Sequence, residues 1–89
     1  MKNYTVRFEQ RAKKVLQKMD KQQASFIMAW IARNLVNTDN PRRHGKALTA
    51  DHTGKWRYRV GEYRLICDIS DETITILILE IGHRSKVYK

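Results

Sequence analysis

The chain has one cysteine, Cys67, and one proline, Pro41, among its 89 residues. A single cysteine excludes an internal disulfide and a cysteine zinc site, and with them a secreted domain held together by disulfides. No apolar run approaches the roughly 18 residues of a membrane span, and the first residues lack the apolar segment of a signal peptide. We therefore expect a cytoplasmic protein with no membrane contact, in which Cys67 is a buried structural thiol.

The patterns of several enzyme classes are also missing. The three histidines, His44, His52 and His83, have no second ligand at a metal-binding spacing, and no glycine-rich phosphate loop precedes a helix. Two carboxylates placed for glycosidase-type catalysis are absent as well, because Glu62 falls at a turn and Glu80 is isolated. We expect neither a metal nor a cofactor.

Acidic residues are few compared with basic ones. Nine Asp and Glu stand against 18 Lys and Arg, which gives a formal net charge of +9. Such a balance favours a nucleic acid or another acidic surface as partner. Residues 42–64 form the positive pole, since they hold two acidic residues and seven basic ones: Arg42, Arg43, Lys46, Lys55, Arg57, Arg59 and Arg64.

Hydrophobic periodicity predicts a strand, two helices and then three strands. Residues 4–8 alternate as a short strand, and Ala12, Val15, Leu16 and Met19 follow at helical spacing. Asp20 with Gln23 resembles a capping box that opens a second helix. The apolar stripe of this helix is expected to contain Ala24, Ile27, Met28, Ile31 and Leu35, widened by Phe26 and Trp30.

The second half of the chain predicts a hairpin and a central strand. The nearly continuous apolar run over 73–81 is typical of a central strand that is covered, at least in part, on both faces. We expect a single α+β domain over 1–89 with the order β-α-α-β-β-β. Its two N-terminal helices pack on one face of a mostly antiparallel twisted sheet.

Residues 55–66 are predicted to form the hairpin, with Gly61 and Glu62 as a type II′ turn. This register sets Arg59 directly opposite Arg64 and places Arg57 opposite Ile66. Like charges that face each other across a sheet cost up to about 1 kcal/mol, which an anionic ligand would offset. We interpret the three arginines as a phosphate site; the alternative is a solvated strand face. Asp68 is expected to pair with Lys55.

A loop of about a dozen residues after Pro41 adds further cations. Loops of this length in small domains are often functional. We expect RNA binding through Arg42, Arg43 and Lys46 of the loop and through Lys55 beyond it. The alternative is a basic loop in which no single residue is essential.

Six residues are candidates for catalysis on the sheet face that the helices leave open: Arg57, Arg59, Arg64, His83, Arg84 and Tyr88. Metal-free cleavage of RNA needs cations that stabilise a pentavalent phosphorane and groups that move protons. Arginine binds phosphate oxygens bidentately and keeps its charge, so it cannot be the base. His83 is the natural proton carrier near neutral pH, and Tyr88 can orient the nucleophile, share in proton transfer or stack on a base.

The sequence resembles the RelE-type members of the RelE/ParE superfamily of bacterial toxins. The matching segments are residues 45–48 (GKAL), 54–66 (GKWRYRVGEYRLI), 81–84 (IGHR) and 87–88 (VY). The resemblance implies a microbial-ribonuclease-like fold. It also implies a toxin that cleaves mRNA in the ribosomal A site and is held inactive in a hetero-oligomer with a cognate antitoxin.

Carried over by position, Arg57 and Arg59 stand where RelE toxins place catalytic lysines, and Tyr88 matches their C-terminal tyrosine. Arg64 and Arg84 match the phosphate-stabilising arginines, whereas His83 fills a basic position. Arginine in place of lysine removes one conceivable general base, so either His83 or the ribosome supplies this function. Two other functions stay open: a ParE-like gyrase inhibitor, and a non-catalytic module that binds RNA by charge alone.

Overall fold

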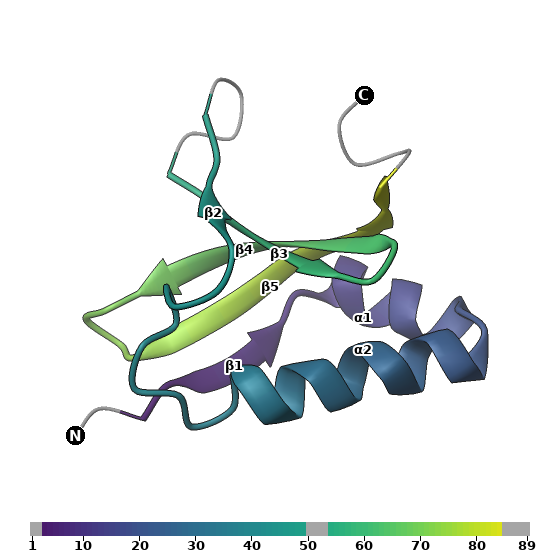
Figure 1. Cartoon of the computed structure of the whole chain (residues 1–89), viewed down its shortest axis with the longest axis horizontal. Helices are drawn as coiled ribbons and strands as arrows, with labels where there is room; N and C mark the ends of the chain where they lie inside the picture. Colours follow the sequence, from purple (N-terminus) through teal and green to yellow (C-terminus); the bar gives the residue numbers. More distant parts are fainter. Residues whose placement is uncertain (1–2, 50–53, 85–89) are drawn as a thin grey trace.

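The computed structural model describes residues 3–49 and 54–84 (Figure 1). It confirms the predicted fold class and element order and adds one short strand, β2. The elements are β1 (Thr5–Phe8), α1 (Gln10–Lys18), α2 (Lys21–Asn34), β2 (Lys46–Ala47), β3 (Trp56–Val60), β4 (Tyr63–Ser70) and β5 (Thr75–His83).

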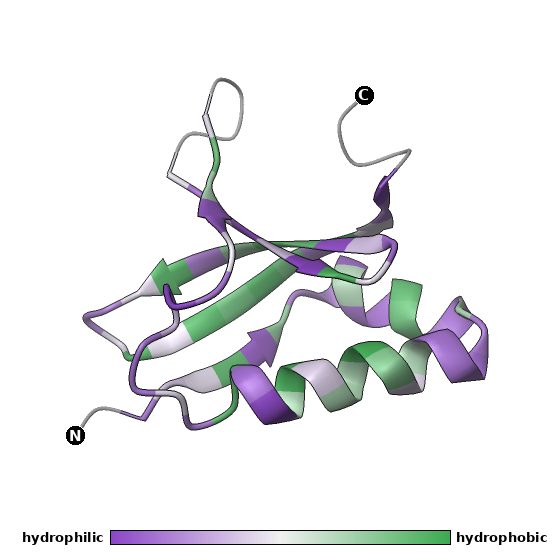
Figure 2. Ribbon diagram, viewed as in Figure 1, coloured by the Kyte–Doolittle hydropathy of each residue, from purple (hydrophilic) through white to green (hydrophobic). Residues whose placement is uncertain are grey.

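The five strands form one sheet in the order β1-β5-β4-β3-β2. Only β1 runs parallel to its neighbour, β5, and the other pairs are antiparallel. Since β5 lies between β1 and β4, the strand with the most continuous apolar sequence is central, and Figure 2 shows it apolar along most of its length. The prediction of a central strand near residues 73–81 is confirmed.

Both helices cover the same face of the sheet (Figure 1). Side chains from α1 and α2 meet alternate side chains of β3, β4 and β5 in one apolar core. Within residues 3–49 and 54–84, neither α1 nor α2 covers the opposite face of the sheet (Figure 1). The buried members of this core are Tyr4, Ala12, Ile27, Ile31, Leu35, Tyr58, Val60, Leu65, Cys67, Ile76, Ile78 and Ile81.

The apolar stripe of α2 is narrower than the sequence suggested. Ile27 and Ile31 are buried as predicted, but Phe26 and Met28 are 53% and 42% exposed, so the predicted stripe is wrong at these two positions. The helix packs against one sheet only. Phe26 and Met28 are the immediate neighbours of Ile27, and the rotation of about 100° per residue directs their side chains away from the sheet. Asp20 is the N-cap of α2 as predicted, but its carboxylate accepts its hydrogen bond from the Gln22 N–H at 3.1 Å, whereas the predicted capping box pairs it with Gln23.

Two aromatic side chains of β3 fix the loop that follows α2. The buried Tyr58 donates its hydroxyl to the Pro41 carbonyl at 2.5 Å, and the Trp56 indole donates to the His44 carbonyl at 2.8 Å. Gly45 lies so close to β3 that a Cβ there would be 2.2 Å from the Arg57 carbonyl oxygen. The loop therefore lies against β3, where β2 pairs with it.

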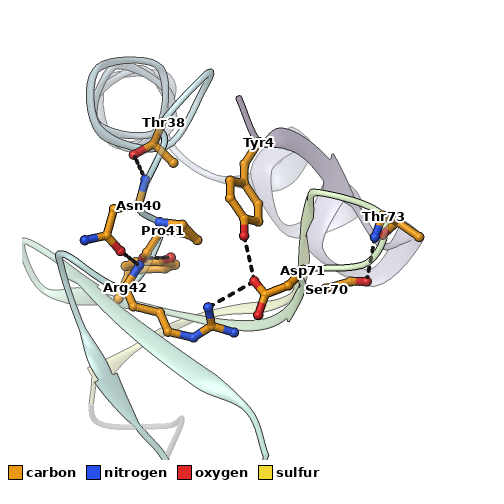
Figure 3. A network of polar contacts seen from close by, with 9 residues as sticks. Tyr4, Thr38, Asn40, Pro41, Arg42, Ser70, Asp71 and Thr73 are labelled. Atoms are coloured by element: carbon orange, nitrogen blue, oxygen red, sulfur yellow. Dashed lines mark hydrogen bonds and ion pairs between the residues drawn. The ribbon is translucent and has the colours of Figure 1, made fainter. Parts of the chain in front are cut away.

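A second set of polar contacts ties this loop to the other end of the sheet (Figure 3). Asp71, in the turn between β4 and β5, accepts hydrogen bonds from the Tyr4 hydroxyl at 2.6 Å and the Arg42 guanidinium at 3.0 Å. The hydrogen bond from Tyr4 to Asp71 raises the pKa of the phenol. Three segments far apart in the sequence thus meet at one carboxylate.

Candidate active site

The hairpin of β3 and β4 has the predicted register. Arg59 pairs with Arg64, Arg57 with Ile66, and Val60 with Tyr63. Gly61 has φ +61°, whereas the φ of Glu62 is not positive. Positive φ at the first central residue alone defines a type II′ turn, so the predicted turn is confirmed.

Arg57, Arg59 and Arg64 lie on the sheet face opposite the helices, and we call these three residues the arginine face. Their strand neighbours Tyr58, Val60 and Leu65 belong to the core, and successive side chains of a strand point to opposite faces. Two rows cross the sheet here. One consists of Arg59, Arg64 and Gly82, and the adjacent row consists of Lys46, Arg57, Ile66 and Glu80.

Arg64 is the most unusual member of this face. It is the one buried charged residue in the described part of the chain, with 8% of its surface exposed. Its Nε has no hydrogen-bond partner, and its Nη1 reaches the Tyr63 carbonyl only at 3.4 Å. A buried cation without an anionic partner is costly, and a guanidinium cannot relieve that cost by losing its proton. The arrangement is suited to an anionic ligand that supplies the missing contacts.

Arg84 lies at the tip of the hairpin, next to this row. Its backbone N–H donates to the Glu62 carbonyl at 2.8 Å, and its Nε lies 3.1 Å from the Glu62 carboxylate. Both side chains of this ion pair are more than half exposed, so the pair orients Arg84 and contributes little stability. The structure thus brings Arg84 to the edge of the arginine face.

His83 does not join the arginine face. It pairs with Tyr63 across β4 and β5, and the two rings make an edge-to-face contact with centroids 5.6 Å apart. Two residues earlier on the same strand, Ile81 belongs to the core, so alternation directs His83 to the helix-covered side. The expectation of one surface shared by all six candidates is therefore not met at His83. Tyr88 lies outside the described residues.

The cations predicted to bind RNA are largely paired with carboxylates. Arg42 contacts Asp71 at 3.0 Å, Arg43 contacts Asp39 at 3.2 Å, and Lys55 contacts Asp68 at 3.1 Å as predicted. Lys46 differs from them, because it faces Arg57 and no carboxylate in the described part of the chain pairs with it. Sequence reasoning missed the partners of Arg42 and Arg43, although Asp39 precedes Arg43 by four residues.

Two features that the described residues lack bear on the class of site. Residues 3–49 and 54–84 hold no group of three or more His, Cys, Asp or Glu side chains that could bind a metal ion. None of the helices in the same ranges is long and apolar enough to cross a membrane.

The helix-backed five-stranded sheet is also found in proteins of a known family. Residues 6–88 match the family model described as the ParE toxin of the type II toxin–antitoxin system parDE. The chain belongs to this family and is therefore a toxin of the RelE/ParE superfamily, as its sequence resemblance indicated.

Individual relatives lie on the RelE side of the superfamily. The chain is 34% identical to Toxin RelG of Mycobacterium tuberculosis over 86 residues, which is 97% of each chain. It also resembles a chain of the M. tuberculosis toxin–antitoxin complex RelBE2, with a TM-score of 0.83, 34% identity and 97% coverage of both chains. The isolated E. coli RelE toxin shares the fold, with a TM-score of 0.72 at 22% identity over 96% of this chain and 90% of that one.

Proposed function

We propose that this toxin is a ribosome-dependent endoribonuclease that cleaves mRNA in the A site and so inhibits translation in the cytoplasm. The observation that carries the proposal is Arg64, a buried guanidinium with an unsatisfied Nε, directly opposite Arg59. A phosphodiester would supply the anionic oxygens that this pair lacks. The 34% identity to a RelG toxin over nearly the full chain supports it.

In the proposed reaction the 2′-hydroxyl of the substrate attacks the adjacent phosphorus atom. Negative charge grows on the phosphoryl oxygens, and guanidinium groups fixed beforehand stabilise that charge without reorganising. We assign this role to Arg57, Arg59 and Arg64, with Arg84 reaching the same phosphate from the hairpin tip. Tyr88, four residues beyond Arg84, is assigned to the leaving group by its resemblance to the C-terminal tyrosine of RelE toxins.

His83 is given no direct contact with the phosphate in this proposal. Its ring packs against Tyr63 on the other side of the sheet. We propose instead that His83 supports the end of β5, from which Arg84 emerges.

We also infer a cognate antitoxin that binds this toxin in a hetero-oligomer. The M. tuberculosis RelBE2 structure and the intact E. coli RelBE structure are both toxin–antitoxin complexes. A net charge of +9 on this chain favours an acidic partner, because complementary charge speeds association and selects the partner.

The test uses purified toxin with an mRNA, in the presence and absence of translating ribosomes. We expect cuts only with ribosomes, at A-site codons, leaving 5′-hydroxyl ends. Arg64→Ala is expected to abolish the cuts. A wild-type protein that leaves mRNA intact in an active translation extract would refute the proposal.

A second function follows from the family match itself. The matched model is described as a ParE toxin, and a ParE-like gyrase inhibitor would act on a protein–DNA complex without cutting RNA. Double-strand breaks in DNA after induction, together with intact mRNA, would favour this alternative.

A further inference from the structure

The row of Arg59 and Arg64 continues on β5 to a residue without a side chain, Gly82. The next pair along the same two strands, Leu65 with Ile81, belongs to the core, so Arg64 and Gly82 lie together on the opposite face of the sheet. Gly82 is only half-buried, whereas 8% of the Arg64 surface is exposed. A partly exposed glycine therefore stands directly across from the buried cation.

The backbone of β5 does not require a glycine at this position. The φ of Gly82 is not positive, in contrast to the φ of Gly45, Gly54 and Gly61. Glycine inside a strand costs stability, because it has no side chain to pack and loses more conformational entropy on folding. Such a glycine often marks a place where a ligand or another part of the backbone comes close. The missing side chain, rather than the backbone conformation, is the property to be explained.

A bulge determines which residue of β5 faces Arg64. Cys67 pairs with Ile78, whereas the residue before Cys67 pairs with Glu80, so β5 contains one extra residue here. With an unshifted register Ile81 would stand opposite Arg64, and its side chain would leave the core. Bulges are common next to active sites, where they change which side chain is presented. This one sets a glycine, in place of an isoleucine, across from the buried arginine.

The hydrogen bonds around Arg64 give the direction of its guanidinium group. The Glu62 carbonyl accepts a hydrogen bond from the Arg84 N–H and so points toward the β5 side. Carbonyls of successive strand residues point to opposite neighbours, so the Tyr63 carbonyl, which Arg64 Nη1 contacts at 3.4 Å, points toward β3. In a planar guanidinium the edge formed by Nε and Nη2 lies opposite Nη1. The edge that contains the unpartnered Nε therefore faces the β5 side, where Gly82 stands.

A second cation follows Gly82 along the chain. Residues two apart in an extended strand lie on one face about 6.6 Å apart, which places Arg84 beside the glycine. The Glu62 carboxylate holds Arg84 Nε at 3.1 Å. On the other side of β5, the pairing with β1 reaches only to Ile78, so within the described residues no strand adjoins Gly82 there. A phosphate on this glycine can contact guanidinium groups from two directions.

We propose that Gly82 is the access residue of the site, over which the scissile phosphate reaches Arg64; this inference rests on the proposed ribonuclease function. The phosphodiester lies against the Cα of Gly82, and one non-bridging oxygen accepts the hydrogen bond that Arg64 Nε otherwise lacks. The second non-bridging oxygen is within reach of Arg84. A side chain as large as valine at residue 82 would occupy the place of the phosphate.

The first experiment follows the Nε–H signal of Arg64 in ¹⁵N NMR spectra of the purified toxin. The signal is identified by its absence from Arg64→Lys, and the probe is a 2′-O-methyl dinucleotide, which has one phosphodiester and cannot be cleaved. At constant ionic strength we expect the wild-type signal to shift and saturate. Gly82→Val is expected to weaken this binding by at least about tenfold, the value for a lost hydrogen bond to a charged group. Gly82→Ala is expected to show a smaller loss.

The order of the two variants separates access from structure. Strand propensity rises from glycine to alanine to valine, so the melting temperature is expected to stay level or rise in the same order. Binding is expected to fall in that order, because the larger side chain blocks more of the site. Thr75→Val, at the opposite end of β5 where it pairs with Ser70, is the control and is expected to bind as the wild type does. Gly82→Ala decides the test if Gly82→Val folds poorly.

Two results would assign Gly82 no role in access. One is unchanged binding in Gly82→Val, or a wild-type Arg64 signal that does not respond to the dinucleotide. The other is lost binding together with a melting temperature lowered by more than about 5 °C in both variants, which would make Gly82 a packing residue.

Cleavage of mRNA on programmed ribosomes connects the site with the proposed function. Gly82→Val is expected to lower the single-turnover rate by at least about 10²-fold, as the loss of a transition-state contact would. Wild-type cleavage with an equally active Gly82→Val would overturn this inference alone. A wild type that binds the dinucleotide at Arg64 but leaves mRNA intact in an active translation extract would instead overturn the proposed function.

Discussion

Arg59 and Arg64 face each other directly across β3 and β4, and the more buried of the two, Arg64, has an Nε without a hydrogen-bond partner. Neighbouring strands that place two guanidinium groups opposite each other gain no stability from doing so. The two arginines belong to one cross-strand row, which continues from Arg64 to Gly82 on β5. Because glycine has no side chain, a ligand can approach Arg64 from that end of the row. The stability of the protein and its activity are therefore expected to respond in opposite directions at this position.

Arg64→Met tests that relationship. Replacing a buried, poorly satisfied cation with an apolar side chain of similar length is expected to leave the free energy of unfolding unchanged or raise it by about 1 kcal/mol. Cleavage is expected to fall by at least about 10²-fold, because a transition-state contact is lost. Urea denaturation and ribosome-dependent cleavage measure the two effects. A matched Arg33→Met change on the exposed surface of α2 is expected to affect neither.

Gly45→Ala is expected to destabilise the protein more than Gly54→Ala. Both glycines have positive φ, +85° and +93°, so alanine at either position carries a backbone penalty of about 1 kcal/mol. Only at Gly45 would the new Cβ also collide with the Arg57 carbonyl, at 2.2 Å, while nothing lies within 4 Å at Gly54. Thermal unfolding of the two variants measures the difference, and equal shifts would contradict the close packing of the loop on β3.

Stability is expected to fall at alkaline pH. Burial raises the pKa of the Cys67 thiol and of the Tyr58 phenol above their ordinary values, so both stay protonated in the folded state. In the unfolded chain they ionise near pH 8.5 and 10, respectively. The stabilising effect is complete below about pH 8.5 and declines as pH rises, by at most about 1.4 kcal/mol per pH unit for each group.

Cys67→Ala separates the two groups. This variant is expected to be less stable overall because it leaves a cavity, yet its stability is expected to stay level between about pH 8.5 and 10. Chemical denaturation at intervals of half a pH unit measures the profile. A wild-type profile that is flat up to pH 10 would contradict the buried state of the thiol.

RNA affinity is expected to depend more on Lys46 than on Arg43. Lys46 faces Arg57 and has no carboxylate partner in the described part of the chain, whereas Arg43 lies 3.2 Å from Asp39. The plot of log K against log salt has a negative slope, and Lys46→Ala is expected to make it less steep by about 0.7 for single-stranded RNA, the value for one lost phosphate contact. Arg43→Ala is expected to change it less. Binding titrations at several salt concentrations decide between them.

The sequence was most informative where short-range rules determine structure. Strand alternation and a Gly-Glu turn predicted the pairing of Arg59 with Arg64, and the structure has that register. The same alternation, applied to the end of β5, excludes His83 from the arginine face, but the sequence did not reveal where β5 stops relative to β4. That relation depends on the bulge beside Ile66, which is a property of the pair of strands.

Contacts between distant segments were the part that the sequence could not predict. Asp71 joins Tyr4 and Arg42 across 67 and 29 residues, respectively (Figure 3), and no periodicity encodes such a meeting. Arg42, which the sequence suggested would bind RNA, is instead paired with Asp71 and helps to hold the loop in place. Phe26, read from the sequence as a core residue, lies instead against the hairpin turn, where its ring would be 3.1 Å from a Cβ at Gly61.

The most direct test of the central claim is a map of mRNA 5′-ends and DNA breaks in growing cells that express the wild type, Arg64→Ala or Arg84→Ala. If the arginine face binds the scissile phosphate, we expect ribosome-phased mRNA cuts with the wild type and their loss in Arg64→Ala. We also expect a strong reduction in Arg84→Ala and intact DNA throughout. Uncut mRNA in cells arrested by the wild type, or cuts that persist unchanged in Arg64→Ala, would contradict this role of the arginine face.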